Sequence, residues 1–126
     1  MTNPHKGRTG FDRLLHAADN SLAGLRSAYR EESAFRQEVW LTLVLVPLAW
    51  WWGDTPLERA LLISAVVLVL VVELLNSGIE AAIDRISFEE HPLAKRAKDY
   101  GSAAVMLALL LCATLWLGVG WRRMGW

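Results

Sequence analysis

Apolar positions divide the chain into four segments, and the pattern predicts that each is a helix. In residues 11–33 the larger apolar side chains recur at helical spacing and charged side chains fall mostly elsewhere, which predicts an amphipathic helix. Such a helix suits a membrane surface, although an ordinary soluble helix would show the same pattern. Residues 57–86 contain the most apolar run, with thirteen consecutive uncharged residues from Ala60 to Val72.

Three of the segments are predicted to cross a bilayer, whose apolar core requires roughly 20 helical residues. Residues 34–52 reach that length, with Pro47 as the place where a kink is expected. Residues 57–86 exceed it, so we expect their charged C-terminal end to project into water. The residue before a proline is disfavoured in the α region, so His91–Pro92 is expected to break the helix and the third span to cover residues 98–121.

We therefore predict an all-α integral membrane protein, with residues 1–126 forming one domain. The composition agrees, because 54% of the residues are hydrophobic and seven are tryptophan, which prefers the membrane–water interface. The net charge of zero gives no support to a nucleic-acid partner, and none is expected. The single cysteine, Cys112, cannot form an intrachain disulfide.

The basic residues predict the orientation of the chain, because cytoplasmic loops are enriched in lysine and arginine. Residues 1–38 contain six of them and the linker after the long apolar segment contains four. Three others, Arg59, Arg122 and Arg123, fall on the opposite side. We therefore expect the N-terminus and the linker in the cytoplasm, and the amphipathic helix on the cytoplasmic face.

A column of polar side chains follows the most apolar run. Glu73 and Glu80 are seven residues apart, about 20° around a helix and roughly 10 Å along it, and Asn76 lies between them on the same side. A charge at the centre of a spanning helix costs about 2.5–3.5 kcal/mol on insertion scales. Glu73 is therefore expected to be protonated or to face a wet cleft. The column indicates a functional site, and an interhelical hydrogen-bond network that fixes helix register is the alternative.

Further polar residues are expected at the same cytoplasmic level. They precede the first span or open the third: Glu31, Glu32, Arg36, Glu38, Lys98, Asp99 and Ser102. Carboxylates and a lysine at an interface can hold Mg²⁺ and phosphates, although the acidic run alone also fits a solvated helix shoulder. The chain contains no GxxxxGK[ST] loop and no HRD or DFG motif. The residues alone thus predict a carboxylate-lined site without specifying a reaction.

Three longer motifs resemble those of the prokaryotic diacylglycerol kinase family. They are ESAFRQE at 32–38, VVELLNSGIEAAIDR at 71–85 and HPLAKRAKDYGSAAV at 91–105, and FRQE resembles the Gram-negative branch. The resemblance extends from about Phe11 to the last span. It implies a surface helix plus three transmembrane helices, assembled as a homotrimer in the bacterial inner membrane with active sites between subunits. It also implies phosphorylation of diacylglycerol to phosphatidate with MgATP.

The resemblance further implies roles for individual residues. Glu73 would be the catalytic base, Glu32 and Glu80 would hold Mg²⁺, and Asn76 would support the polar column. The nucleotide would be bound by Asn20, Glu32, Glu80, Glu89, Glu90, His91, Lys98 and Asp99. The lipid would be bound by Arg13, Ala34, Phe35, Arg36, Gln37, Glu38, Glu73 and Ser102. Some family members have an aromatic residue in place of Asn20, which puts a stacking contact from that position in question.

Two alternatives to a diacylglycerol kinase stay open from the sequence. One is an undecaprenol kinase with the same machinery, because an isoprenoid and a diacyl lipid both need only an apolar cleft and a reachable hydroxyl. The other is a non-catalytic membrane oligomer, either a proton-conducting subunit or an assembly factor. Glu73 within a span suits proton binding, but Lys98, Asp99 and the acidic residues would have no role there.

Overall fold

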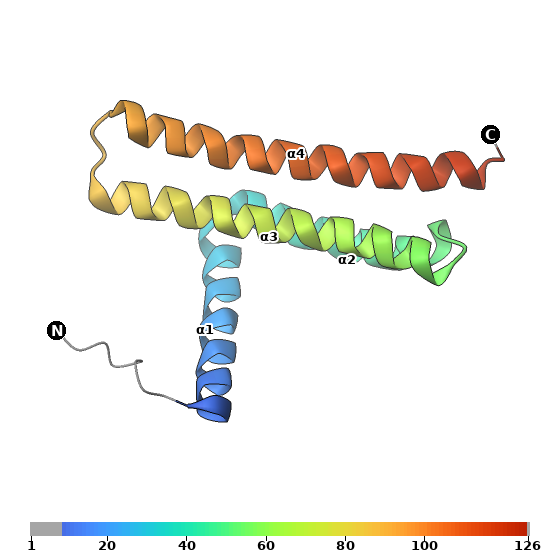
Figure 1. Ribbon diagram of the computed structural model, residues 1–126, viewed down its shortest axis with the longest axis horizontal. Coiled ribbons are helices and arrows are strands. Elements are labelled where there is room, and N and C mark those ends of the chain that lie inside the picture. Colours follow the sequence, from blue (N-terminus) through green and yellow to red (C-terminus); the bar gives the residue numbers. More distant parts are fainter. Residues whose placement is uncertain (1–8, 126) are drawn as a thin grey trace.

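Helices make up almost all of the described chain, as predicted, and three of them run side by side (Figure 1). The structure is a computed structural model that describes residues 9–125. Lys6 and Arg8, which contribute to the predicted orientation, lie outside these residues, as do both ends of the predicted domain. The helices are α1 (Gly10–Glu31), α2 (Ser33–Trp52), α3 (Pro56–Ile86) and α4 (Pro92–Arg123).

The two longest helices begin in the same way, with a capping side chain followed by a proline. The Thr55 hydroxyl accepts a hydrogen bond from the backbone N–H of Glu58 at 3.1 Å at the start of α3. At the start of α4, His91 Nδ1 accepts one from the N–H of Leu93, also at 3.1 Å. Proline suits the first helical position, where its missing N–H would have no partner. As expected, His91 is extended and the chain is not helical between α3 and α4, but α4 already begins at Pro92, ahead of the predicted residue 98.

Helix α3 lies between α2 and α4 and carries most of the buried side chains. Its buried residues recur at helical spacing along the length of the helix: Leu62, Ala65, Val66, Val69, Glu73 and Ser77. Near one end of the bundle the Trp52 indole N–H donates to the Trp116 carbonyl at 3.0 Å, which ties α2 to α4. The small side chains on α3 allow close helix packing, and the buried Glu73 places a carboxyl group within it.

Within the described residues, α3 and α4 are the two helices long and apolar enough to cross a membrane. Helix α2 does not meet the same test, because charged residues in its first turns and three terminal tryptophans lower its hydropathy. Large apolar side chains on α4 remain exposed, including Leu107 at 62% and Leu117 at 72%. Exposed apolar surface of this extent requires lipid or a protein partner.

Helix α1 runs crosswise to the other three and joins them at the start of α2 (Figure 1). Arg36 fixes this junction, because its Nη1 donates to the carbonyls of Tyr29 at 2.9 Å and Arg30 at 3.2 Å. The Trp40 indole N–H also donates to the Tyr29 hydroxyl at 3.1 Å. The crosswise direction is the one expected of an amphipathic helix that lies on a membrane surface.

Candidate active site

Three carboxylates lie within electrostatic range of Glu73, where the start of α2 meets the C-terminal half of α3. Glu73 is only 7% exposed. Glu32 and Glu80 lie close enough to repel a negative charge on Glu73, and Glu38 and Glu73 are also within range of mutual repulsion. We call Glu32, Glu38, Glu73 and Glu80 the carboxylate cluster. Helix α3 supplies two of its members, Glu38 lies in the second turn of α2, and Glu32 lies between α1 and α2.

Asn76 connects this cluster to α4. Its Nδ2 faces Glu80 Oε1 at 3.5 Å, which is a long hydrogen bond. Across from it, Gly101 brings the α4 backbone so close that a Cβ at this position would collide with Asn76 Oδ1. The absence of a side chain at Gly101 therefore allows Asn76 to sit between the two helices.

Two buried oxygens of this region have no hydrogen-bond partner, namely Glu38 Oε2 and Asn76 Oδ1. Buried polar atoms are nearly always paired, so unpaired acceptors at a carboxylate-rich site suit a cation or a donor from a ligand. Within residues 9–125 no three His, Cys, Asp or Glu side chains converge as a complete metal site. Mg²⁺ needs only one or two carboxylates when phosphate oxygens supply further ligands, so the cluster fits Mg²⁺ bound together with a nucleotide.

A cavity of about 800 Å³ lies between the end of α3 and the start of α4. Five of the residues predicted to bind the nucleotide line it, together with Asp84: Glu89, Glu90, His91, Lys98 and Asp99. Lys98 Nζ contacts Asp84 Oδ1 at 2.9 Å, and Lys95 Nζ contacts Asp99 Oδ2 at 2.6 Å. Each lysine is thus held by an aspartate of the same cavity, which fixes where the positive charges lie.

Asp84 was not predicted as a site residue. One signal was available in the sequence, because Asp84 follows Glu80 by one helical turn and therefore continues the polar column. The ion pair with Lys98 joins residues fourteen apart on two different helices. Such a pairing depends on how α3 and α4 pack, so the sequence pattern alone does not give it.

The remaining predicted residues are more dispersed. Arg13 and Asn20 are exposed on α1, the helix that runs crosswise to the others. Ser102 is exposed on α4. The predicted residues in the first turns of α2 have different surroundings. Phe35 is 2% exposed and Arg36 bonds to α1, whereas Ala34 and Gln37 are exposed. A single chain therefore does not bring all the predicted lipid-binding and nucleotide-binding residues together.

Comparison with known proteins identifies the family. The sequence model described as prokaryotic diacylglycerol kinase matches residues 19–119, most of the chain. This chain belongs to the prokaryotic diacylglycerol kinase family. It is 52% identical over 114 residues to the diacylglycerol kinase of Pseudomonas aeruginosa, covering 90% of this chain and 93% of the relative.

Other relatives are similar over a comparable length. The diacylglycerol kinase of Escherichia coli strain K12 is 48% identical over 117 residues, which cover 93% of this chain and 96% of the relative. That of Haemophilus influenzae is 46% identical over 111 residues, covering 88% and 94%. The family predicted from the three motifs is therefore confirmed, and these relatives come from Gram-negative bacteria, as FRQE indicated.

Proposed function

We propose that this protein is a diacylglycerol kinase, which transfers the γ-phosphate of MgATP to the hydroxyl of diacylglycerol and yields phosphatidate. The main structural support is the carboxylate cluster around the buried Glu73, at the same end of the helices as the cavity that contains Lys98. Membership of the family supports the choice of lipid. The reaction needs a lipid hydroxyl and a water-soluble nucleotide to meet, and a membrane–water interface is where both are available.

Glu73 acts as the general base in this proposal. As the lipid oxygen attacks the γ-phosphorus, Glu73 accepts the hydroxyl proton, and the bond from the γ-phosphorus to the departing ADP oxygen breaks. At 7% exposure Glu73 is shielded from water on α3, where a lipid could approach from the membrane. Shielding also limits transfer of the phosphoryl group to water, which would be simple ATP hydrolysis.

Glu32 and Glu80 would hold the Mg²⁺, whose contribution is to neutralise the charge of the phosphates. The unpaired oxygens of Glu38 and Asn76 support a cation in this region. Lys98 lies on α4 within the adjoining cavity and would bind the phosphates. Lys98 pairs with the carboxylate of Asp84, and phosphate binding would replace this contact with a stronger one to a more highly charged group.

We further propose a homotrimer in the bacterial inner membrane, with α2, α3 and α4 as spans and the N-terminus in the cytoplasm. The exposed apolar side chains of α4 and the isolated position of α1 support this assembly. In an oligomer, Arg13 and Asn20 of one subunit could complete a site that begins with Glu73 of another. The excess of basic residues near the carboxylate cluster supports a cytoplasmic location for the site.

Transfer of ³²P from [γ-³²P]ATP to lipid tests this function. Purified protein in mixed micelles is offered diacylglycerol or undecaprenol in separate reactions, each with and without Mg²⁺. We expect Mg²⁺-dependent labelling of diacylglycerol and little labelling of undecaprenol. Labelling of undecaprenol alone would show that the lipid is wrong. Labelling of neither lipid by an intact oligomer would contradict the proposed kinase activity.

A further inference from the structure

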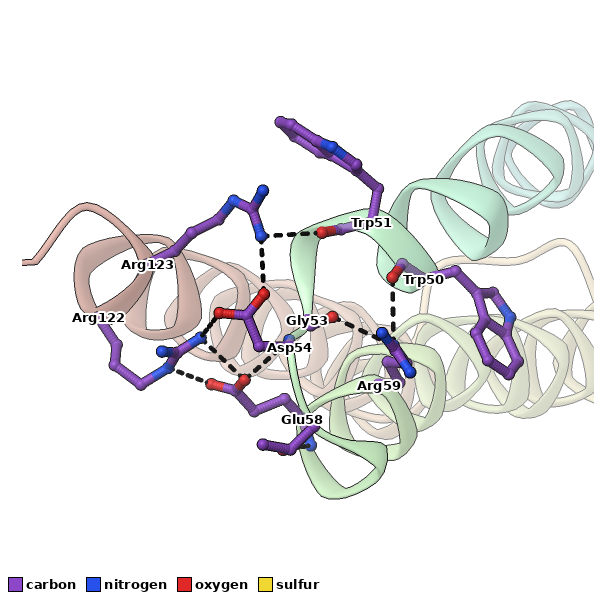
Figure 2. A network of polar contacts seen from close by, with 9 residues as sticks. Trp50, Trp51, Gly53, Asp54, Glu58, Arg59, Arg122 and Arg123 are labelled. Atoms are coloured by element: carbon purple, nitrogen blue, oxygen red, sulfur yellow. Dashed lines mark hydrogen bonds and ion pairs between the residues drawn. The ribbon is translucent and has the colours of Figure 1, made fainter.

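Three arginines lie at the end of the bundle opposite the carboxylate cluster, and two of them are neutralised there (Figure 2). Arg122 bonds to Asp54 Oδ2 at 2.9 Å and to the carboxylate of Glu58. Arg123 bonds to Asp54 Oδ1 at 3.0 Å and to the Trp51 carbonyl. The hydrogen bond from Arg122, more than any other contact, holds the pKa of Asp54 below its ordinary value of 3.8. The two carboxylates thus balance the charges of Arg122 and Arg123.

The third arginine, Arg59, has no carboxylate partner within the described residues. Its Nε donates to the carbonyls of Trp50 and Gly53, each at 3.1 Å. Its terminal nitrogens make no hydrogen bond to the described part of the chain. The two bonds to Nε fix the guanidinium at the C-terminus of α2 while leaving its outer edge unoccupied. Arg59 therefore adds a charge that its surroundings orient but do not neutralise.

Gly53 and Trp50 shape the place where this guanidinium lies. A Cβ on Gly53 would meet the Arg59 backbone nitrogen at 3.0 Å and its Cγ at 3.1 Å, so a larger residue would displace the arginine. The Arg59 guanidinium carbon lies 5.2 Å from the centre of the Trp50 ring. A cation over an aromatic face at this separation is attracted to it. Trp50 is itself 60% exposed, so the pair faces the surroundings of the protein.

The chemistry of this pair matches the head of an anionic lipid. A guanidinium binds a phosphate through two parallel hydrogen bonds, and tryptophan prefers the level of lipid headgroups. Leu43 lies seven residues before Trp50 on α2, so the two share a face of that helix, and both are 60% exposed and offer apolar surface for acyl chains. We propose that Arg59 and Trp50 form a binding site for the phosphate group of an anionic phospholipid at the membrane surface opposite the carboxylate cluster.

Several features favour a phospholipid over free phosphate at this place. A single guanidinium provides only two hydrogen bonds and one charge, which is little attraction for an ion that is well hydrated in water. A lipid adds contacts between its acyl chains and the exposed side chains of Trp50 and Leu43 on α2. The site is also separate from the carboxylate cluster, because Arg59 lies fourteen residues before Glu73 on α3, about 21 Å along the helix axis. A lipid bound here would contact the protein without being phosphorylated.

Native mass spectrometry of the detergent-solubilised protein can test the site by measuring lipid adducts during titration with phosphatidylglycerol. The wild-type protein is compared with Arg59→Gln and Arg123→Gln. Both variants lose one positive charge at the same end, and Arg123 also lies over a tryptophan, 4.4 Å from the ring centre of Trp51. Because Asp54 already neutralises Arg123, this variant is a matched control for the general effect of charge.

We expect Arg59→Gln to weaken phosphatidylglycerol binding by about tenfold, the effect of losing one charge-assisted pair of hydrogen bonds, and Arg123→Gln to change it less than twofold. Inorganic phosphate should neither bind nor displace the lipid, and displacement would assign the site to the free ion instead. Equal weakening in both variants, or none in Arg59→Gln, would overturn the proposal. If Arg59→Gln does not fold, Arg59→Lys replaces it in the titration, because lysine keeps the charge but lacks the planar pair of donors. Unchanged lipid binding by Arg59→Lys would also overturn the proposal.

Discussion

Substituting alanine for Gly101 tests whether the contact between α4 and Asn76 organises the candidate active site. Gly101 is buried, and a Cβ there would collide with Asn76 Oδ1 and lie 3.2 Å from its Cγ. The Asn76 Cα is 3.8 Å away, which is an ordinary contact. The amide group can therefore relieve the collision by rotating, without a displacement of the α3 backbone.

The size of each effect follows from this geometry. Overpacking a core costs about 1–3 kcal/mol, and a rotatable amide places this case near the lower limit. Replacing glycine by alanine within a helix stabilises the fold by about 0.5–1 kcal/mol. The two effects oppose each other, so the free energy of unfolding should change by less than about 1 kcal/mol. Rotation would, however, remove the 3.5 Å contact from Asn76 to Glu80. A hydrogen bond to a charged group contributes about 1.5–3 kcal/mol, and the lower value predicts about a tenfold loss in kcat/KM for MgATP.

Steady-state kinetics at several Mg²⁺ concentrations would measure this loss, with Gly118→Ala as the matched control. Gly118 also lies within α4, and a Cβ there would meet nothing within 4 Å. We expect the control to keep wild-type kcat/KM and the Gly101→Ala enzyme to need more Mg²⁺. If the two variants have the same kcat/KM and the same Mg²⁺ dependence, Asn76 does not position Glu80.

Three further predictions concern other contacts. Lys98→Gln should raise KM for ATP about tenfold or more, measured by the same kinetics, because a charge-assisted contact to phosphate is lost; an unchanged KM would contradict nucleotide binding. The pKa of Asp54 is lowered by its hydrogen bond from Arg122. The stability that this pair gives the folded protein is therefore present above pH 3.8 and is lost as the pH falls through the lowered pKa. Melting temperatures from pH 3 to 8 should therefore separate the wild-type protein from Arg122→Gln at neutral pH and converge in acid, and a constant difference would refute the pairing. Trp52→Phe should lower the free energy of unfolding, measured in detergent, by about 1 kcal/mol, because the hydrogen bond to the Trp116 carbonyl is lost. An unchanged free energy of unfolding would show that this bond does not stabilise the bundle.

The helices and the polar face of α3 could be predicted from the sequence because they depend on local patterns. The spacing of Glu73, Asn76 and Glu80 follows from helical geometry alone. The break at His91–Pro92 was predictable in the same way, because the residue before a proline is disfavoured in the α region and His91 is indeed extended. The helical residues 92–97 were not predicted, because the third span was counted from residue 98, whereas the His91 cap and Pro92 already start a helix.

Contacts between helices could not be predicted in the same way. The ion pairs of Arg122 join it to Asp54 and Glu58, which are 68 and 64 residues away in the sequence. The predicted topology placed these residues on the same side of the membrane but could not select the partners. Likewise, the effect of Gly101 on Asn76 depends on a backbone approach between α3 and α4 that no residue pattern specifies.

Removal of the carboxylate at Glu73 tests the central proposal most directly. The measurement is the kcat of Glu73→Gln for Mg²⁺-dependent phosphorylation of diacylglycerol, with the oligomeric state of wild-type protein and variant compared by size-exclusion chromatography. Loss of a general base should lower kcat by at least about a hundredfold, while the oligomer stays intact because glutamine fills nearly the same volume. A correctly assembled Glu73→Gln protein that retains more than about a tenth of wild-type kcat would contradict the role of Glu73 as the base.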